Sequence, residues 1–141
     1  MSRSGYSDDY EYAVLWEQAV RRATTGYRGQ HLLRKLRDAL DAMPVKRLIA
    51  DDITDDASDV CALGALDPSV DGYDAQSLAE HFNVARALAA EIVYQNDEAH
   101  AARPWWEKFS DGLHAPEETP EERWTRMRAW VESQIVEHRT A

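Results

Sequence analysis

The densest group of side chains that could carry chemistry is a run of five aspartates within nine residues, D-D-I-T-D-D-A-S-D at 51–59. Carboxylates this close together could bind Ca²⁺, but the run lacks the glycine at the sixth and the glutamate at the twelfth position of an EF-hand loop. Their spacing also resembles that of a DNA strand, with one negative charge per roughly 3.4 Å. The run indicates either a solvated acidic loop or a surface that imitates nucleic acid. Its members are Asp51, Asp52, Asp55, Asp56 and Asp59.

A second acidic group stands in N-D-E-A-H at 96–100. Asp97, Glu98 and His100 would suit acid–base catalysis if they were desolvated. At the end of a helix such a group is more typical of a solvated terminus. We therefore add Asp97 and Glu98 to the acidic residues expected to contact a partner.

Other catalytic and metal-binding signatures are missing from the sequence. The five histidines form no H-x-x-x-H pair, and one cysteine cannot build a zinc box. No phosphate-binding glycine loop and no G-x-S-x-G motif is present. Cys61 lies in an apolar run and is expected to be a buried small hydrophobe in a reducing compartment. We therefore expect no enzyme activity, no metal and no cofactor.

Charge is unevenly distributed along the chain, whose formal net charge is -10. Residues 21–47 hold eight Lys/Arg and two acids, a local +6, and the rest of the chain holds eight Lys/Arg and 24 acids, a local -16. Such a chain can meet partners of either sign, or its two parts can pair internally. Two i,i+4 pairs are expected on one helix face, Arg34 with Asp38 and Arg37 with Asp41. The residues that would contact a nucleic acid are Arg21, Arg22, Arg28, Arg34, Lys35 and Arg86.

Two adjacent tryptophans, Trp105 and Trp106, follow a proline in R-P-W-W. Neighbouring residues on a regular element cannot both face one core. Either one ring is exposed, where it would be a good anchor for a protein partner, or an irregular loop buries both.

The elements that must position these groups are mostly helical. Apolar residues recur at spacings of three and four over 8–24 and 29–43, and a last helix runs from 120 to about 137. Thr119, Pro120 and Glu122 form a capping box with proline at the first helical position. No run is long and apolar enough for a membrane span. The prediction is a mainly α fold of about five helices in one domain covering 1–141.

Two segments remain ambiguous. Residues 47–66 fit either a short β-hairpin or a buried helical turn, because periodicity cannot decide between them in runs this short. Residues 77–94 resemble a helix-turn-helix with its turn near Asn83. The second helix would offer Arg86, two alanines and a glutamate to a major groove, where Arg, Lys, Asn or Gln are wanted. A helical hairpin that belongs to the core is the better interpretation.

Several segments together resemble a family of small uncharacterised proteins of bacteriophages and prophages. These segments are MSRSGY at the N-terminus, RGQHLLRKLRDALDAMPVKRLIA at 28–50, DVCALGAL at 59–66, FNVARALAAEI with NDE within 82–98, and ETPEERWTRMRAWVESQI at 118–135. The resemblance implies a phage setting and carries over no catalytic or binding residues. By analogy, small phage proteins often inhibit or modify host machinery.

These observations favour a non-enzymatic phage-type protein in the cytoplasm of an infected bacterium. Its acidic surface would imitate DNA and bind a host protein or protein–nucleic-acid complex, such as a restriction or CRISPR-type defence system. The alternative is a nucleic-acid-binding regulator that uses the basic segment 21–47 and the helix pair at 77–94. A homodimer formed through the opposite charges also remains open, and no membrane partner is expected.

Overall fold

Six helices account for most of the chain that the structure, a computed structural model, describes. It describes residues 10–70, 74–99 and 118–136, with the backbone alone for 10–16. These residues contain no β-strand, so the prediction of a mainly α fold is confirmed. The helices are α1 Tyr10–Thr25, α2 Tyr27–Ala42, α3 Ala62–Leu66, α4 Ala75–Phe82, α5 Arg86–Asp97 and α7 Pro120–Gln134.

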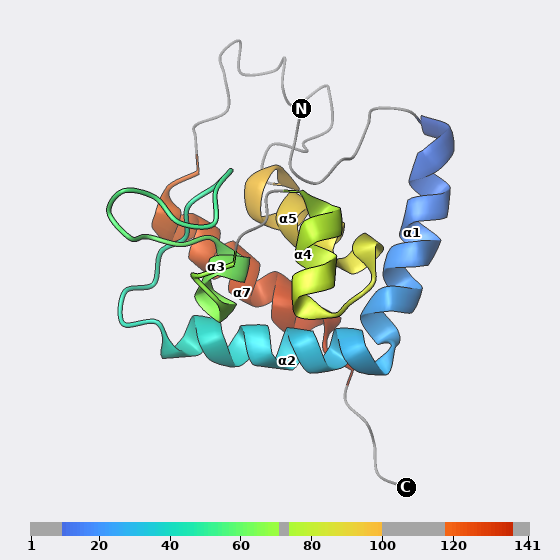
Figure 1. Cartoon of the computed structure of the whole chain (residues 1–141), viewed down its shortest axis with the longest axis horizontal. Coiled ribbons are helices and arrows are strands. Elements are labelled where there is room, and N and C mark those ends of the chain that lie inside the picture. Colours follow the sequence, from blue (N-terminus) through green and yellow to red (C-terminus); the bar gives the residue numbers. More distant parts are fainter. Residues whose placement is uncertain (1–9, 71–73, 100–117, 137–141) are drawn as a thin grey trace, which may run out of the picture.

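Helices α2 and α7 bury the apolar stripes that the sequence predicts, and they pack against each other. Figure 1 shows α2 along the lower edge of the molecule, with α1 rising from its N-terminal end. The predicted capping box at the start of α7 is present, with reciprocal bonds between Thr119 and Glu122. The buried apolar residues of the two helices are Leu32, Leu33, Leu36, Leu40, Met127 and Val131.

Helix α5 occupies the centre of the described fold. It packs against α1, α3, α4 and α7, and it buries residues on several sides of its axis. Asn83, in the left-handed conformation with φ 56°, ends α4 and turns the chain into α5. The segment that resembles a helix-turn-helix is therefore a helical hairpin within the core, as the interpretation of the sequence favoured.

The junction of α1 and α2 depends on one glycine. A Cβ atom on Gly29 would lie 1.9 Å from the carbonyl oxygen of Ala23 and 3.1 Å from a methyl carbon of Leu88. Glycine therefore lets the first turn of α2 lie directly against the last turns of α1, beneath α5.

Residues 47–66 combine the two alternatives that the sequence leaves open. Thr54 and Val60 form a single antiparallel bridge, and Cys61 donates its backbone N–H to the carbonyl oxygen of Ile53 at 3.1 Å. The apolar run after Cys61 forms helix α3. Of the hairpin alternative, one bridge that closes a loop is present, because the second half of the segment is helical.

Candidate functional site

The five aspartates lie in a loop with defined backbone geometry, here called the acidic loop (residues 51–59). The carboxylate of Asp55 accepts hydrogen bonds from the N–H groups of Ala57 and Asp59, at 3.0 and 2.9 Å. The carbonyl oxygen of Asp55 accepts from the N–H of Ser58 at 3.0 Å. One aspartate therefore folds the tip of the loop.

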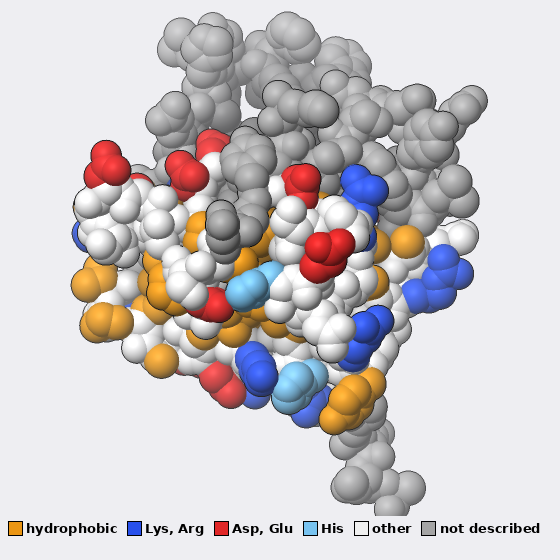
Figure 2. Space-filling model, in the orientation of Figure 1, with side chains coloured by type: hydrophobic (Ala, Val, Ile, Leu, Met, Phe, Trp, Pro, Cys, Tyr) orange, Lys and Arg blue, Asp and Glu red, His pale blue; other side chains and the backbone are white. Residues whose placement is uncertain are grey.

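Four of the five aspartates are exposed. Asp59 is the exception, because its carboxylate pairs with the guanidinium of Arg47 at 2.8 Å. In Figure 2, several Asp and Glu side chains lie at the upper left, where Figure 1 places the loop, and others lie over the middle and at the lower edge of that view. The loop thus presents a local group of negative charges, and its exposed aspartates are Asp51, Asp52, Asp55 and Asp56.

Asp97 lies against the acidic loop, where it supports the backbone of the loop from inside the fold. The predicted role of its carboxylate in contacting a partner does not fit this buried position. Its side chain is 8% exposed, and Oδ1 accepts a hydrogen bond from the backbone N–H of Asp51 at 3.0 Å. The same oxygen accepts from Nδ2 of Asn96 at 2.8 Å. Asp97 therefore fixes the start of the loop from inside the fold. Its neighbour Glu98 is half-buried.

Asn96 connects both ends of this segment and is 1% exposed. Its Oδ1 accepts from the backbone N–H of Ala62 at 3.1 Å, after the loop, and its Nδ2 donates to the carbonyl oxygen of Ile49 at 2.9 Å, before the loop. A buried side-chain amide with both groups satisfied orders the segments it joins. The sequence offers no signal for this role, because an asparagine near a helix end is commonplace.

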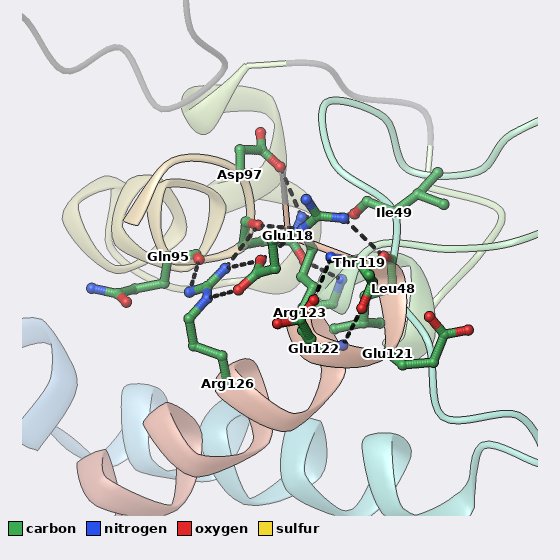
Figure 3. Close-up of polar contacts among 12 residues, drawn as sticks. Leu48, Ile49, Gln95, Asp97, Glu118, Thr119, Glu121, Glu122, Arg123 and Arg126 are labelled. Carbon is green, nitrogen blue, oxygen red and sulfur yellow. Dashed lines mark hydrogen bonds and ion pairs between the residues drawn. The ribbon is translucent and has the colours of Figure 1, made fainter. Parts of the chain in front are cut away.

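Two arginines of α7 complete this arrangement, which we call the buried polar network (Asn96, Asp97, Glu118, Arg123 and Arg126). Figure 3 shows Arg123 and Arg126 reaching from the first turns of α7 toward Glu118 and the end of α5. Arg123, 8% exposed, donates from Nε to the carbonyl oxygen of Asn96 and from Nη1 to that of Leu48, both at 3.1 Å. The backbone just before the acidic loop is therefore joined to α5 and α7 at once.

Arg126 adds a bidentate contact to the buried polar network. Its Nε and Nη2 donate to the two carboxylate oxygens of Glu118 at 2.6 and 3.0 Å, and its Nη1 donates to the carbonyl oxygen of Gln95 at 2.5 Å. Two guanidinium groups thus lie at the C-terminal carbonyls of α5, where the helix dipole favours cations.

The acidic loop also rests directly on α3. A Cβ atom on Gly64 would lie 2.4 Å from the carbonyl oxygen of Ile53 and 2.9 Å from the Cβ of Val60. Glycine at this position allows the two sides of the loop to close over the helix.

The basic residues predicted to contact a nucleic acid lie away from the acidic loop, on α1, α2 and the start of α5. Arg34 is partly buried and donates to the carbonyl oxygen of Val136 at 2.9 Å. Arg37 pairs with Asp38 and Glu132, and Asp41 pairs with Arg128. The expected i,i+4 ion pairs are therefore wrong, because Arg34 bonds to the backbone just after α7, and Arg37 and Asp41 pair with residues of α7. Arg37 acts on Asp41 only as a minor cause of its lowered pKa. The exposed members of the predicted set are Arg21, Arg22, Arg28, Lys35 and Arg86.

Basic and acidic parts of the sequence do pair internally in places. Two ion pairs join the basic segment to an acid outside it, one between Arg47 and Asp59 and one between Arg37 and Glu132. Both pairs lie in the second half of the segment. In the part of the chain that the structure describes, no residue of the first half forms an ion pair with an acid.

On the surface, a serine, a histidine and an aspartate lie close together, as in the catalytic triad of a hydrolase, but their hydrogen bonds run in a different order. Asp67 accepts a hydrogen bond from the hydroxyl of Ser69 at 2.6 Å and contacts Nε2 of His81 at 2.8 Å. These bonds, that of Ser69 first, lower the pKa of Asp67. Nucleophilic catalysis needs the imidazole between serine and carboxylate, whereas here the carboxylate stands between the other two.

Further candidates lie outside the described residues, namely His100, Trp105 and Trp106. Within residues 10–70, 74–99 and 118–136, no three His, Cys, Asp or Glu side chains are grouped as a metal ion requires. No helix in these ranges has the length and apolar character needed to cross a bilayer.

Comparison with known proteins adds no relative to this picture. No family model matches the chain, and no curated protein or solved structure is significantly similar to it.

Proposed function

We propose that this chain is a non-catalytic binding protein whose acidic loop docks on the basic surface of a host nucleic-acid-binding protein and blocks it. The observation that carries the proposal is the combination of exposed charge with a fixed backbone. Asp51, Asp52, Asp55 and Asp56 are exposed on a loop that the buried polar network holds at both ends.

A fixed loop favours binding because less conformational entropy is lost when the partner arrives. Four exposed carboxylates within residues 51–56 concentrate negative charge on one short loop, as phosphates do along a DNA strand. A surface that binds DNA phosphates through Lys and Arg would therefore find comparable charges on this loop. The resemblance to phage proteins supports a bacterial host protein as the target.

The test compares two triple variants that remove the same charge. Asp51→Asn, Asp52→Asn and Asp56→Asn neutralise the loop, and asparagine tolerates the left-handed backbone of Asp51, φ 69°. The matched control carries Glu17→Gln, Asp38→Asn and Glu80→Gln, which alter exposed carboxylates on α1, α2 and α4.

Each protein is used as bait in a lysate of the host bacterium, and the captured protein is then purified and given a labelled DNA duplex. Wild type and control should displace the DNA, and the loop variant should need about tenfold more protein. Recovery of no nucleic-acid-binding protein would overturn the proposal. Equal displacement by the two triple variants would overturn the role of the loop.

The alternative in which α4 and α5 read DNA bases has less support. A recognition helix must lie in the major groove with one face free. Arg86 is the exposed residue of α5, whereas Ala90 on the same expected face is 4% exposed.

A further inference from the structure

A second surface of opposite charge lies where α1 meets α2. Residues 18–37 hold six Lys/Arg and no acid, in a chain that has 26 Asp/Glu among 141 residues. Four of these cations are exposed, and we call them, together with Tyr27 and His31, the basic face. The cations are Arg21, Arg22, Arg28 and Lys35.

Among the residues that the structure describes, no carboxylate neutralises the exposed cations of the basic face. None of the four takes part in an ion pair within the described residues. Arg28 donates from Nη1 to the side-chain oxygen of Asn83 at 3.1 Å, which orients its guanidinium without cancelling its charge. The acids that flank the stretch are Glu17 on α1 and Asp38, and Asp38 pairs with Arg37.

An aromatic ring stands among these charges. Tyr27 is 87% exposed, well above the other exposed large hydrophobic residues of the described chain, Val45 and Val136. Its ring lies nearly parallel to that of His31, with an angle of 5° and centroids 6.3 Å apart. A flat ligand stacked on the free face of Tyr27 would extend this pair.

We propose that the basic face binds single-stranded nucleic acid, with phosphates on the arginines and lysine and a base stacked on Tyr27. Non-specific single-strand binding combines these two elements, a positively charged surface and an aromatic ring that any base can cover. A duplex keeps its bases stacked on one another, so it would use the cations and leave the ring without a role. An acidic segment of a second copy would likewise need the cations alone.

This surface stands apart from the acidic loop. In the view of Figure 2, most visible Lys and Arg side chains lie at the right and lower edges, over the end of α1 and the start of α2. The acidic groups of the loop lie on the opposite side of that view. The inference therefore does not rest on the function proposed for the loop.

The test measures the fluorescence anisotropy of a labelled oligothymidylate of about 15 nucleotides at low and moderate salt. Wild type should bind with an affinity that falls steeply as salt rises. Tyr27→Ala should weaken binding about tenfold, and Tyr27→Phe, which keeps the ring, should restore it. Lys35→Gln should weaken binding several-fold relative to its matched control Lys46→Gln, beyond the end of the same helix.

Three results would overturn the proposal. The first is absence of binding at low salt. The second is binding of a duplex, or of an oligomer of abasic sites, with the same affinity as oligothymidylate, together with a Tyr27→Ala variant that binds as tightly as wild type. The cations alone would then account for the binding. The third is a mass that rises with protein concentration and returns to that of a monomer in Lys35→Gln, which would assign the face to a second copy of the chain. Urea unfolding of each variant shows whether it is folded.

Discussion

The side chain of Asn96, at the end of α5, accepts a hydrogen bond of 3.1 Å from the backbone N–H of Ala62, at the start of α3. The same side chain donates to the backbone at Ile49. One buried amide thus joins the central helix to the two points where the chain enters and leaves the acidic loop. The stability of the fold and the placement of the loop consequently depend on the same residue.

Asn96→Ala should lower the free energy of unfolding by about 2–4 kcal/mol, because a buried donor and a partly buried acceptor lose their partner. Urea denaturation measures this change. Gln95→Ala, one residue earlier, removes a partly buried contact with Glu91 and should cost under about 0.5 kcal/mol. Equal effects of the two substitutions would show that the network does not hold the loop.

Gly29→Ala should destabilise the protein by about 1–3 kcal/mol or more, since its methyl group would lie 1.9 Å from a backbone oxygen. This loss opposes the gain in helix propensity that alanine normally brings. Thermal unfolding provides the measurement. Gly26→Ala is the control, because its Cβ would lie 3.3 Å from its nearest backbone oxygen. A stable Gly29→Ala protein would contradict the close approach of α1 and α2.

Gly64→Ala should displace the acidic loop and leave most of the fold intact. The added methyl group would lie 2.4 Å from the carbonyl oxygen of Ile53, which accepts the N–H of Cys61. Hydrogen exchange at the Cys61 amide should therefore become faster. The amide of Arg123, which donates to the carbonyl oxygen of Thr119 at the start of α7, should exchange as in wild type. Unchanged exchange at Cys61 would place the loop away from α3.

The pair between Asp41 and Arg128 predicts a pH dependence of stability. The hydrogen bond from Arg128 is the main cause that holds the pKa of Asp41 below its ordinary value of 3.8. A carboxyl with a lowered pKa in the fold stabilises it above the unfolded pKa, and this contribution is lost as pH falls through the folded pKa. Asp41→Asn should therefore cost up to about 1 kcal/mol near neutral pH, reduced by solvent screening at this exposed pair.

The check is urea unfolding of Asp41→Asn and wild type from neutral pH down to about pH 3. The difference between the two proteins should be constant above about pH 5 and shrink below pH 4. A difference for Asp41→Asn that persists unchanged at low pH would mean that packing, and not charge, is responsible.

Elements that depend on local pattern could be predicted from the sequence. The stripe of α2, the capping box of α7 and the turn at Asn83 follow from spacing and residue type over a few positions. The ion pairs could not be predicted in this way. Asp41 pairs with Arg128, 87 positions further along the sequence, and no local rule identifies that partner. The buried polar network was missed for the same reason, since Arg123 and Asn96 look like ordinary exposed helix residues until tertiary packing covers them.

The anchoring contacts of the acidic loop have a consequence for how its sequence can change. The network reaches the loop segment through main-chain groups, the carbonyl oxygens of Leu48 and Ile49 and the N–H of Asp51. Main-chain groups are the same in every residue except proline. Mutation can therefore alter the side chains at Asp52 and Asp56 without disturbing the anchors. Under the proposed function, such changes would exchange one target for another while the scaffold stays unchanged.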